Sequence, residues 1–211
     1  MTLVAFDFDG TLSDDEMIVA LAEAAGVADQ VAAVTEQAMR GELSYAESLR
    51  ERASLLAGLS TEAAAAAYDG TTLRPDAPRL LDGLQDAGAT TAILTGGFEP
   101  GVEAALDEAG VSVDAVVANR LPTADGALTG AVEGPLIEGT KDEALRTVAA
   151  EAGVDPDDAI AVGDGANDRP MLEAAGLEIG FRPKPGVGKA CDTTVTSMTE
   201  LQETLERGGV L

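Results

Sequence analysis

The stretch LVAFDFDGT, residues 3–11, decides the fold. Residues 3–8 form a short, largely apolar run that is typical of a buried β-strand, and Asp7, Asp9 and Gly10 mark its end. In an extended strand, side chains two residues apart point the same way, so Asp7 and Asp9 are expected to face one small volume. Ligands of open parallel sheets bind beyond the carboxyl ends of the strands. The stretch suggests a site there, although for two acids standing alone a solvated loop is the favoured interpretation.

The rest of the chain alternates between short apolar runs and Ala-rich amphipathic segments. Buried strands are expected at residues 91–95, 115–118, 159–162 and, more weakly, 177–181. Helices are expected at residues 78–87, 100–109 and 141–152, each followed by a glycine that can end it. Alternating helices and continuous apolar strands predict an α/β fold with a Rossmann-like parallel sheet covered on both faces.

Two segments interrupt this alternation. Residues 14–74 show helical periodicity without a convincing strand, which predicts an inserted helical-bundle cap. We therefore divide the chain into a catalytic core, residues 1–13 plus 75–211, and a cap, residues 14–74. Residues 121–136 contain Asp125-Gly126 between short alternating segments, which predicts a β-hairpin.

The composition is strongly acidic, with 38 Asp and Glu against 13 Lys and Arg and a net charge of −25. This charge repels nucleic acids and anionic membranes, so we expect neither as a partner. The acids are spread along the chain, and Lys141, Lys184 and Lys189 are its only lysines. This pattern is typical of a halophilic protein, in which molar salt screens charges beyond about 3 Å. An acidic protein from a low-salt organism is the alternative.

Several residue types that common mechanisms require are missing. The chain has no His, which excludes Ser-His-Asp triads, Cys-His pairs and His metal sites. Cys191 is the single cysteine, and it lacks the downstream Arg of a cysteine-phosphatase loop. No signal-like segment begins the sequence, and no apolar run approaches the roughly 20 residues of a membrane span. We expect a cytoplasmic protein whose chemistry rests on carboxylates, hydroxyls, Lys and Arg.

Polar groups also follow the later strands. The loops after parallel strands lie at one edge of the sheet, so we expect these groups to lie close together. Thr95-Gly96-Gly97 follows the second strand, and Lys141 opens a later helix. The segment GDGAND, residues 163–168, follows another strand. A hydroxyl, backbone N–H groups and a Lys suit phosphoryl oxygens, and carboxylates from two strands suit Mg²⁺.

The chain thus carries four motifs in order, namely residues 7–11, residues 95–97, Lys141 and residues 163–168. They resemble the motifs of the haloacid dehalogenase superfamily. Within it, the chain most resembles the phosphoserine phosphatase family. The segments that carry this likeness include Glu16, Met39, residues 45–52, 93–98, 118–121 and 162–168, so it covers the cap as well as the core. Two positions depart from the family pattern, since Gly10 and Thr95 stand where Ser is common.

The resemblance implies a role for each motif residue in an Mg²⁺-dependent phosphatase. Asp7 would be the nucleophile that forms an aspartyl-phosphate, and Asp9 the general acid and base. The metal would be held by the side chains of Asp7 and Asp164 and the backbone carbonyl of Asp9, with Asp168 supporting that shell. Four residues would hold the phosphoryl oxygens, namely Thr95, Gly96, Lys141 and Asn167.

The resemblance also implies how the cap would select its substrate. Phosphoserine carries an ammonium and a carboxylate, and Glu16 and Arg52 match the family positions that bind them. Met39 and Tyr45 would form apolar walls. Without the resemblance, the simpler interpretation is that Glu16 complements a helix dipole and Arg52 is solvated.

The expected function is hydrolysis of O-phospho-L-serine, the last step of serine biosynthesis, by a monomer or homodimer. A phosphatase for another small phosphomonoester, such as phosphohomoserine or a sugar phosphate, shares the same core motifs. A non-catalytic receiver phosphorylated on Asp is the alternative from another class. Receivers usually lack both a cap of this size and a second acid two residues after the first.

Overall fold

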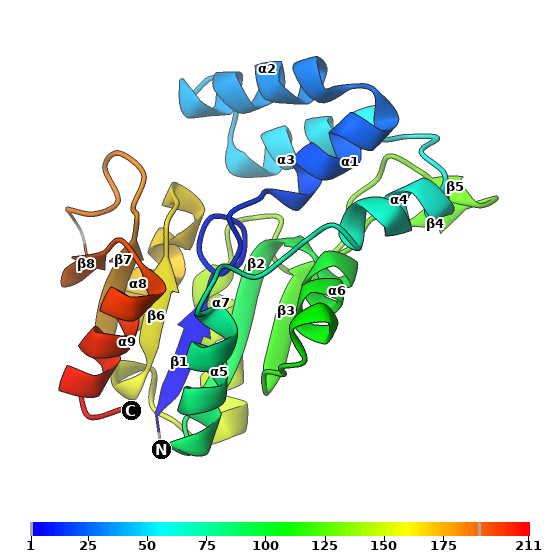
Figure 1. Cartoon of the computed structure of the whole chain (residues 1–211). Helices are drawn as coiled ribbons and strands as arrows, with labels where there is room; N and C mark the ends of the chain where they lie inside the picture. The colour runs from blue at the N-terminus through cyan, green and yellow to red at the C-terminus, as the bar shows by residue number, and fades with distance from the viewer. Residues whose placement is uncertain (1, 190) are drawn as a thin grey trace.

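The computed structural model describes residues 2–189 and 191–211. Its centre is a six-stranded sheet in the order β3-β2-β1-β6-β7-β8, in which every neighbouring pair is parallel (Figure 1). The strands are β1 (Leu3–Phe6), β2 (Thr90–Phe98), β3 (Ala115–Asn119), β6 (Ile160–Gly163), β7 (Leu177–Phe181) and β8 (Thr193–Val195). The predicted parallel α/β fold is confirmed.

Helices cover both faces of this sheet (Figure 1). One face packs against α5 (Ala77–Asp86), α6 (Glu99–Ala109) and α9 (Met198–Arg207). The other packs against α7 (Lys141–Ala152) and α8 (Arg169–Ala174). Strand β1 contributes side chains to the apolar clusters on both faces of the sheet. Val4 and Phe6 belong to the first cluster, and Leu3 and Ala5 belong to the second. All four side chains are fully buried, which explains why the strand is apolar throughout.

Four helices lie between β1 and α5. They are α1 (Met17–Ala25), α2 (Ala28–Met39), α3 (Tyr45–Leu55) and α4 (Thr61–Tyr68). Figure 1 shows α1, α2 and α3 gathered beyond the carboxyl ends of the core strands. Helix α3 begins with a capping box. The Ser44 hydroxyl accepts from the backbone N–H of Glu47, and the Glu47 carboxylate accepts from the backbone N–H of Ser44. We propose residues 14–74 as the cap that the sequence predicts.

The structure differs from the expected elements at β8 and at the end of β1, whereas the expected hairpin is present. Strand β8 was not expected, because its three residues Thr193–Val195 are too short and too polar to stand out. Strand β1 ends at Phe6, so Asp7 and Asp9 lie in the following loop and not in an extended strand. The expected hairpin forms from β4 (Thr123–Ala124) and β5 (Ala127–Leu128), and it pairs with residues 58–61.

None of the helices among the described residues is both long enough and apolar enough to cross a membrane.

Candidate active site

A buried ion cluster lies at the carboxyl ends of β1 and β6. The Lys141 ammonium donates to Asp7 Oδ1 and to Asp168 Oδ1, both at 2.6 Å, and the three side chains are at most 3% exposed. Burial alone would lower the pKa of Lys141, but Asp168 and Asp7 outweigh it and raise that pKa. Burial, reinforced by Asp168, raises the pKa of Asp7, although Lys141 acts in the opposite direction. Lys141 therefore stays charged and compensates two acids.

Asp168 is held by hydrogen bonds on both carboxylate oxygens. Oδ2 accepts from the backbone N–H groups of Asp164 and Gly165 at 2.9 and 2.7 Å. Oδ1 accepts from Lys141 and, at 3.2 Å, from Asn167 Nδ2. These four contacts match the four acceptor positions of a carboxylate. Asp168 is therefore suited to fixing the 164–168 loop and Lys141, as a support for the site.

The carboxylates at this edge suit a divalent cation. Oxygen atoms of Asp7, Asp164 and Asp168 lie within 4.8 Å of one another, and all three side chains are buried. Burial raises the pKa of Asp164, and the Lys184 ammonium, 3.1 Å away, acts in the opposite direction. Hard cations such as Mg²⁺ prefer such oxygen ligands. The residues therefore fit a metal ion.

Gly10 lies where two loops of the site approach each other closely. Its φ is +90°, a conformation that L-residues with a side chain rarely adopt. A Cβ there would lie 2.4 Å from Asp164 Oδ2. Glycine therefore fits this position without backbone strain.

Arg74 binds the same loop. It lies at the end of the proposed cap, where the chain leads back to the core. Its side chain is buried and donates to the carbonyls of Thr11 and Gly10 at 2.8 and 2.9 Å, and it also pairs with Asp14. The guanidinium lies 5.0 Å from the ring centroid of Phe181. Both segments that connect core and cap are thereby tied together beside Asp9. No sequence motif pointed to Arg74.

The end of β2 supplies hydrogen-bond donors. The Thr95 hydroxyl oxygen accepts from the Gly97 N–H at 2.9 Å, so its proton remains available to a phosphoryl oxygen. Asn119, which belongs to a segment of the family likeness but was given no role, is fully buried; it donates to the Gly96 carbonyl at 3.0 Å and accepts from the Leu136 N–H. Gly96 has to lack a side chain, because a Cβ there would lie 1.8 Å from the Tyr45 hydroxyl.

Asp9 lies beside the nucleophile candidate and below the start of α1. Its Oδ1 accepts from the Met17 N–H at 3.4 Å. Burial, with a further contribution from the nearby Glu16 carboxylate, raises the pKa of Asp9 to about 7. Asp7 stands beside Lys141, whereas Asp9 faces Glu16, and this difference in surroundings suits two different roles.

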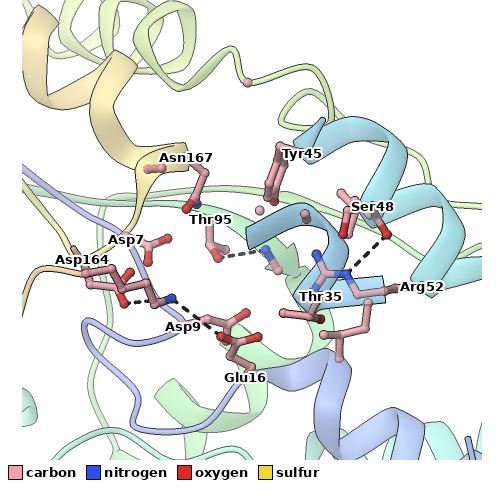
Figure 2. A pocket seen from close by; sticks show the side chains of 18 of the residues that line it. Asp7, Asp9, Glu16, Thr35, Tyr45, Ser48, Arg52, Thr95, Asp164 and Asn167 are labelled. Atoms are coloured by element: carbon pink, nitrogen blue, oxygen red, sulfur yellow. Dashed lines mark hydrogen bonds and ion pairs between the residues drawn. The ribbon is translucent and has the colours of Figure 1, made fainter. Parts of the chain in front are cut away.

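These groups open into one cavity of about 450 Å³ between core and cap (Figure 2). Ten of the twelve predicted site residues line it: Asp7, Asp9, Glu16, Met39, Tyr45, Arg52, Thr95, Gly96, Asp164 and Asn167. The other two, Lys141 and Asp168, are buried next to Asp7. Thr35, Ser48 and Lys184 also line the cavity and were not predicted.

The cap residues differ in how firmly they are held. Arg52 Nε donates to the Ser48 carbonyl at 3.3 Å, which directs the guanidinium along the cavity wall (Figure 2). Glu16 precedes α1 but its side chain makes no capping hydrogen bond, and it faces Lys184 at 3.7 Å. Burial raises the pKa of Tyr45 to about 12, so its hydroxyl stays neutral. Met39 is 80% exposed, so it lines the cavity only with its edge.

Comparison with known proteins agrees with this architecture. A family model described as haloacid dehalogenase-like hydrolase matches residues 4–173. The phosphoserine phosphatase of Halobacterium salinarum is 62% identical over 210 residues, covering 100% of both chains. A solved phospho-aspartyl intermediate analogue of phosphoserine phosphatase is 37% identical with a TM-score of 0.88, covering 96% of this chain and 97% of that one. A substrate-bound phosphoserine phosphatase is 36% identical with a TM-score of 0.89 over the same shares. The chain belongs to the haloacid dehalogenase-like hydrolases and, within them, to the phosphoserine phosphatase family.

Proposed function

We propose that this protein hydrolyses O-phospho-L-serine to serine and phosphate, with Mg²⁺ as its cofactor, and so completes serine biosynthesis. One observation carries the proposal. The cavity joins a buried acid–lysine cluster suited to phosphoryl transfer to a cap wall that presents both an acid, Glu16, and an Arg, Arg52. A phosphorylated amino acid has the complementary groups, namely a phosphate, an ammonium and a carboxylate.

The proposed reaction has two steps. Asp7 Oδ attacks phosphorus, and the bond from phosphorus to the serine oxygen breaks while Asp9 gives its proton to that oxygen. Asp9, now ionised, takes a proton from water, whose oxygen attacks the aspartyl-phosphate and releases phosphate and free Asp7. Thr95, Gly96, Asn167 and Lys141 stabilise the equatorial oxygens throughout. Asp7, Asp164 and the Asp9 carbonyl would hold Mg²⁺, which supplies charge neutralisation for the phosphoryl group.

A phosphate-release panel in molar KCl with Mg²⁺ tests the substrate. The panel comprises O-phospho-L-serine, phosphothreonine, phosphohomoserine and sugar phosphates. Arg52→Met should raise the KM for phosphoserine about 10²-fold, because a hydrogen-bonded charge pair with the carboxylate is lost. Arg50→Met is the matched control, since Arg50 pairs with Glu138 on the surface. A preference for a sugar phosphate would reject phosphoserine as the substrate, and an unchanged KM in Arg52→Met would reject Arg52 as the group that binds its carboxylate.

The pH dependence of kcat/KM should reflect the raised pKa of Asp9. A general acid has to be protonated, so kcat/KM should fall as the pH rises through the raised pKa of Asp9, about 7 in the metal-free protein. Bound Mg²⁺ favours the ionised form and moves this fall to lower pH. Glu16→Gln should move it lower still, because the Glu16 charge helps to raise that pKa.

Profiles from pH 5 to 9 with 3-phosphooxypropionate, which lacks the amino group, separate this effect from ammonium binding. Glu23→Gln, an exposed acid on α1, is the control. An alkaline limb at the same pH in Glu16→Gln would contradict the assignment of Asp9.

We further propose that the protein works in a salt-rich cytoplasm. Support comes from the net charge of −25, the three lysines and the relative from Halobacterium salinarum. Removing salt lengthens the screening distance from about 3 Å at 1 M to about 30 Å at 0.01 M, so the acids repel one another strongly. We expect the thermal midpoint, followed by circular dichroism, to fall steeply between 2 M and 10 mM KCl. A midpoint that stays constant over this range would exclude a salt requirement.

A further inference from the structure

Thr35 lies on α2 at the cap end of the cavity. It lines the cavity together with Glu16 and Arg52, and Figure 2 shows it between these two charged side chains. Glu16 and Thr35 also line a second, smaller cavity between α1 and α2, so they form the wall that separates the two spaces. Neither the motifs nor the proposed reaction gives Thr35 a role.

The hydrogen bonding of Thr35 limits what it can offer a ligand. Its Oγ1 lies 3.0 Å from the Val31 carbonyl, one helical turn earlier. A carbonyl oxygen can only accept, so the hydroxyl proton is committed to Val31. What remains toward the cavity is oxygen lone pairs. Thr35 therefore suits a hydrogen-bond donor and not a carboxylate.

An α-ammonium group is such a donor and has three N–H bonds. One carboxylate, that of Glu16, does not surround it, and an N–H left unpaired in a closed site is costly. The guanidinium of Arg52 has donors only and cannot help. The ammonium and carboxylate of an amino acid share one carbon atom, so their binding groups have to belong to one site, and Glu16, Thr35 and Arg52 line the same cavity (Figure 2).

We propose that Thr35 is a specificity residue that accepts a hydrogen bond from the α-ammonium of the substrate, alongside Glu16. This inference rests on the proposed function and deepens it. It assigns recognition of the ammonium to two acceptors in the proposed cap, Glu16 immediately before α1 and Thr35 on α2. Phosphate esters without an amino group gain nothing from Thr35.

Thr35→Val and Thr35→Ser test this assignment. Valine keeps the shape and removes the oxygen, whereas serine keeps the oxygen. With O-phospho-L-serine, Thr35→Val should raise KM about tenfold at nearly unchanged kcat, the size expected for one hydrogen bond to a charged group. Thr35→Ser should remain within about threefold of the parent. Circular dichroism melting of both variants shows whether each is folded.

The decisive comparison uses 3-phosphooxypropionate, which has the same phosphate and carboxylate but no amino group. Its KM should be the same for the parent and Thr35→Val. An equal rise in KM for both substrates would overturn the proposal in favour of contact with the carboxylate or a general disturbance of the cap. An unchanged KM for phosphoserine in Thr35→Val would overturn it as well. Failure of the proposed function is distinguishable, because it appears in the parent protein as a preference for another phosphate ester.

Discussion

Asp7→Asn should reduce phosphate release from O-phospho-L-serine by about 10⁴-fold or more, because an amide cannot act as the nucleophile. The substitution preserves the shape of the side chain. It removes one of the buried acids. In the parent protein, burial and the neighbouring Asp168 raise the pKa of this acid. The folded metal-free protein loses an unfavourable charge, so its thermal midpoint should not fall. Loss of activity in a protein that melts normally would identify chemistry as the cause.

Mass spectrometry of acid-quenched reactions provides a second measurement for Asp7. The parent should carry a transient phosphate on the peptide that contains residue 7, and Asp7→Asn should carry none. Asp15→Asn is the matched control, because Asp15 is exposed and the change of charge is the same. Phosphate release by Asp7→Asn at the parent rate would remove the basis of the proposed mechanism.

The sequence predicted the core well because apolar runs and their glycine stops are local signals. Residues 177–181 and 141–152 coincide with β7 and α7. Strand β2 extends three residues beyond the expected end, to Phe98, because pairing of Phe98 with Asn119 on β3 continues past an irregularity. Strand β8 was missed because only pairing with β7 makes it a strand. Edge strands of this kind depend on tertiary contacts and not on propensity.

The sequence indicated the site residues of the core more directly than those of the proposed cap. The core acids follow strands, so topology alone brings Asp7 and Asp164 together. Thr35 and Asn119 look like ordinary helix and strand residues, and only the folded structure reveals that Thr35 lines the cavity and that Asn119 binds the Gly96 carbonyl. Lys184 had an available signal, since lysine is so scarce in this chain that each one merits attention. The expected geometry for Asp9 was wrong in detail, because a loop with Gly10 at φ +90° places it, not an extended strand.

Lys141→Met should be the most destabilising single change at the site. Lys141 is 2% exposed and is the shared partner of Asp7 and Asp168, so its removal leaves two buried carboxylates facing each other. Breaking a buried ion pair in this way costs about 3–5 kcal/mol. Activity should also fall by at least about 10³-fold, since the phosphoryl oxygens lose a fixed cation. Lys189→Met, which changes an exposed lysine, should stay within about 0.5 kcal/mol of the parent.

The pH dependence of this loss distinguishes uncompensated charge from lost packing. In the parent, Lys141 lowers the pKa of Asp7 against the effects of burial and Asp168. Without Lys141, the pKa of Asp7 rises further above its unfolded value near 4, so the folded state binds more protons than the unfolded state above that pH. The stability of Lys141→Met should therefore fall as the pH rises and recover toward pH 5. Thermal melts in 2 M KCl at pH 5 and pH 8 measure this directly. A deficit of equal size at both pH values would mean that Lys141 acts through packing, and the two carboxylates would then have to be compensated by groups other than Lys141.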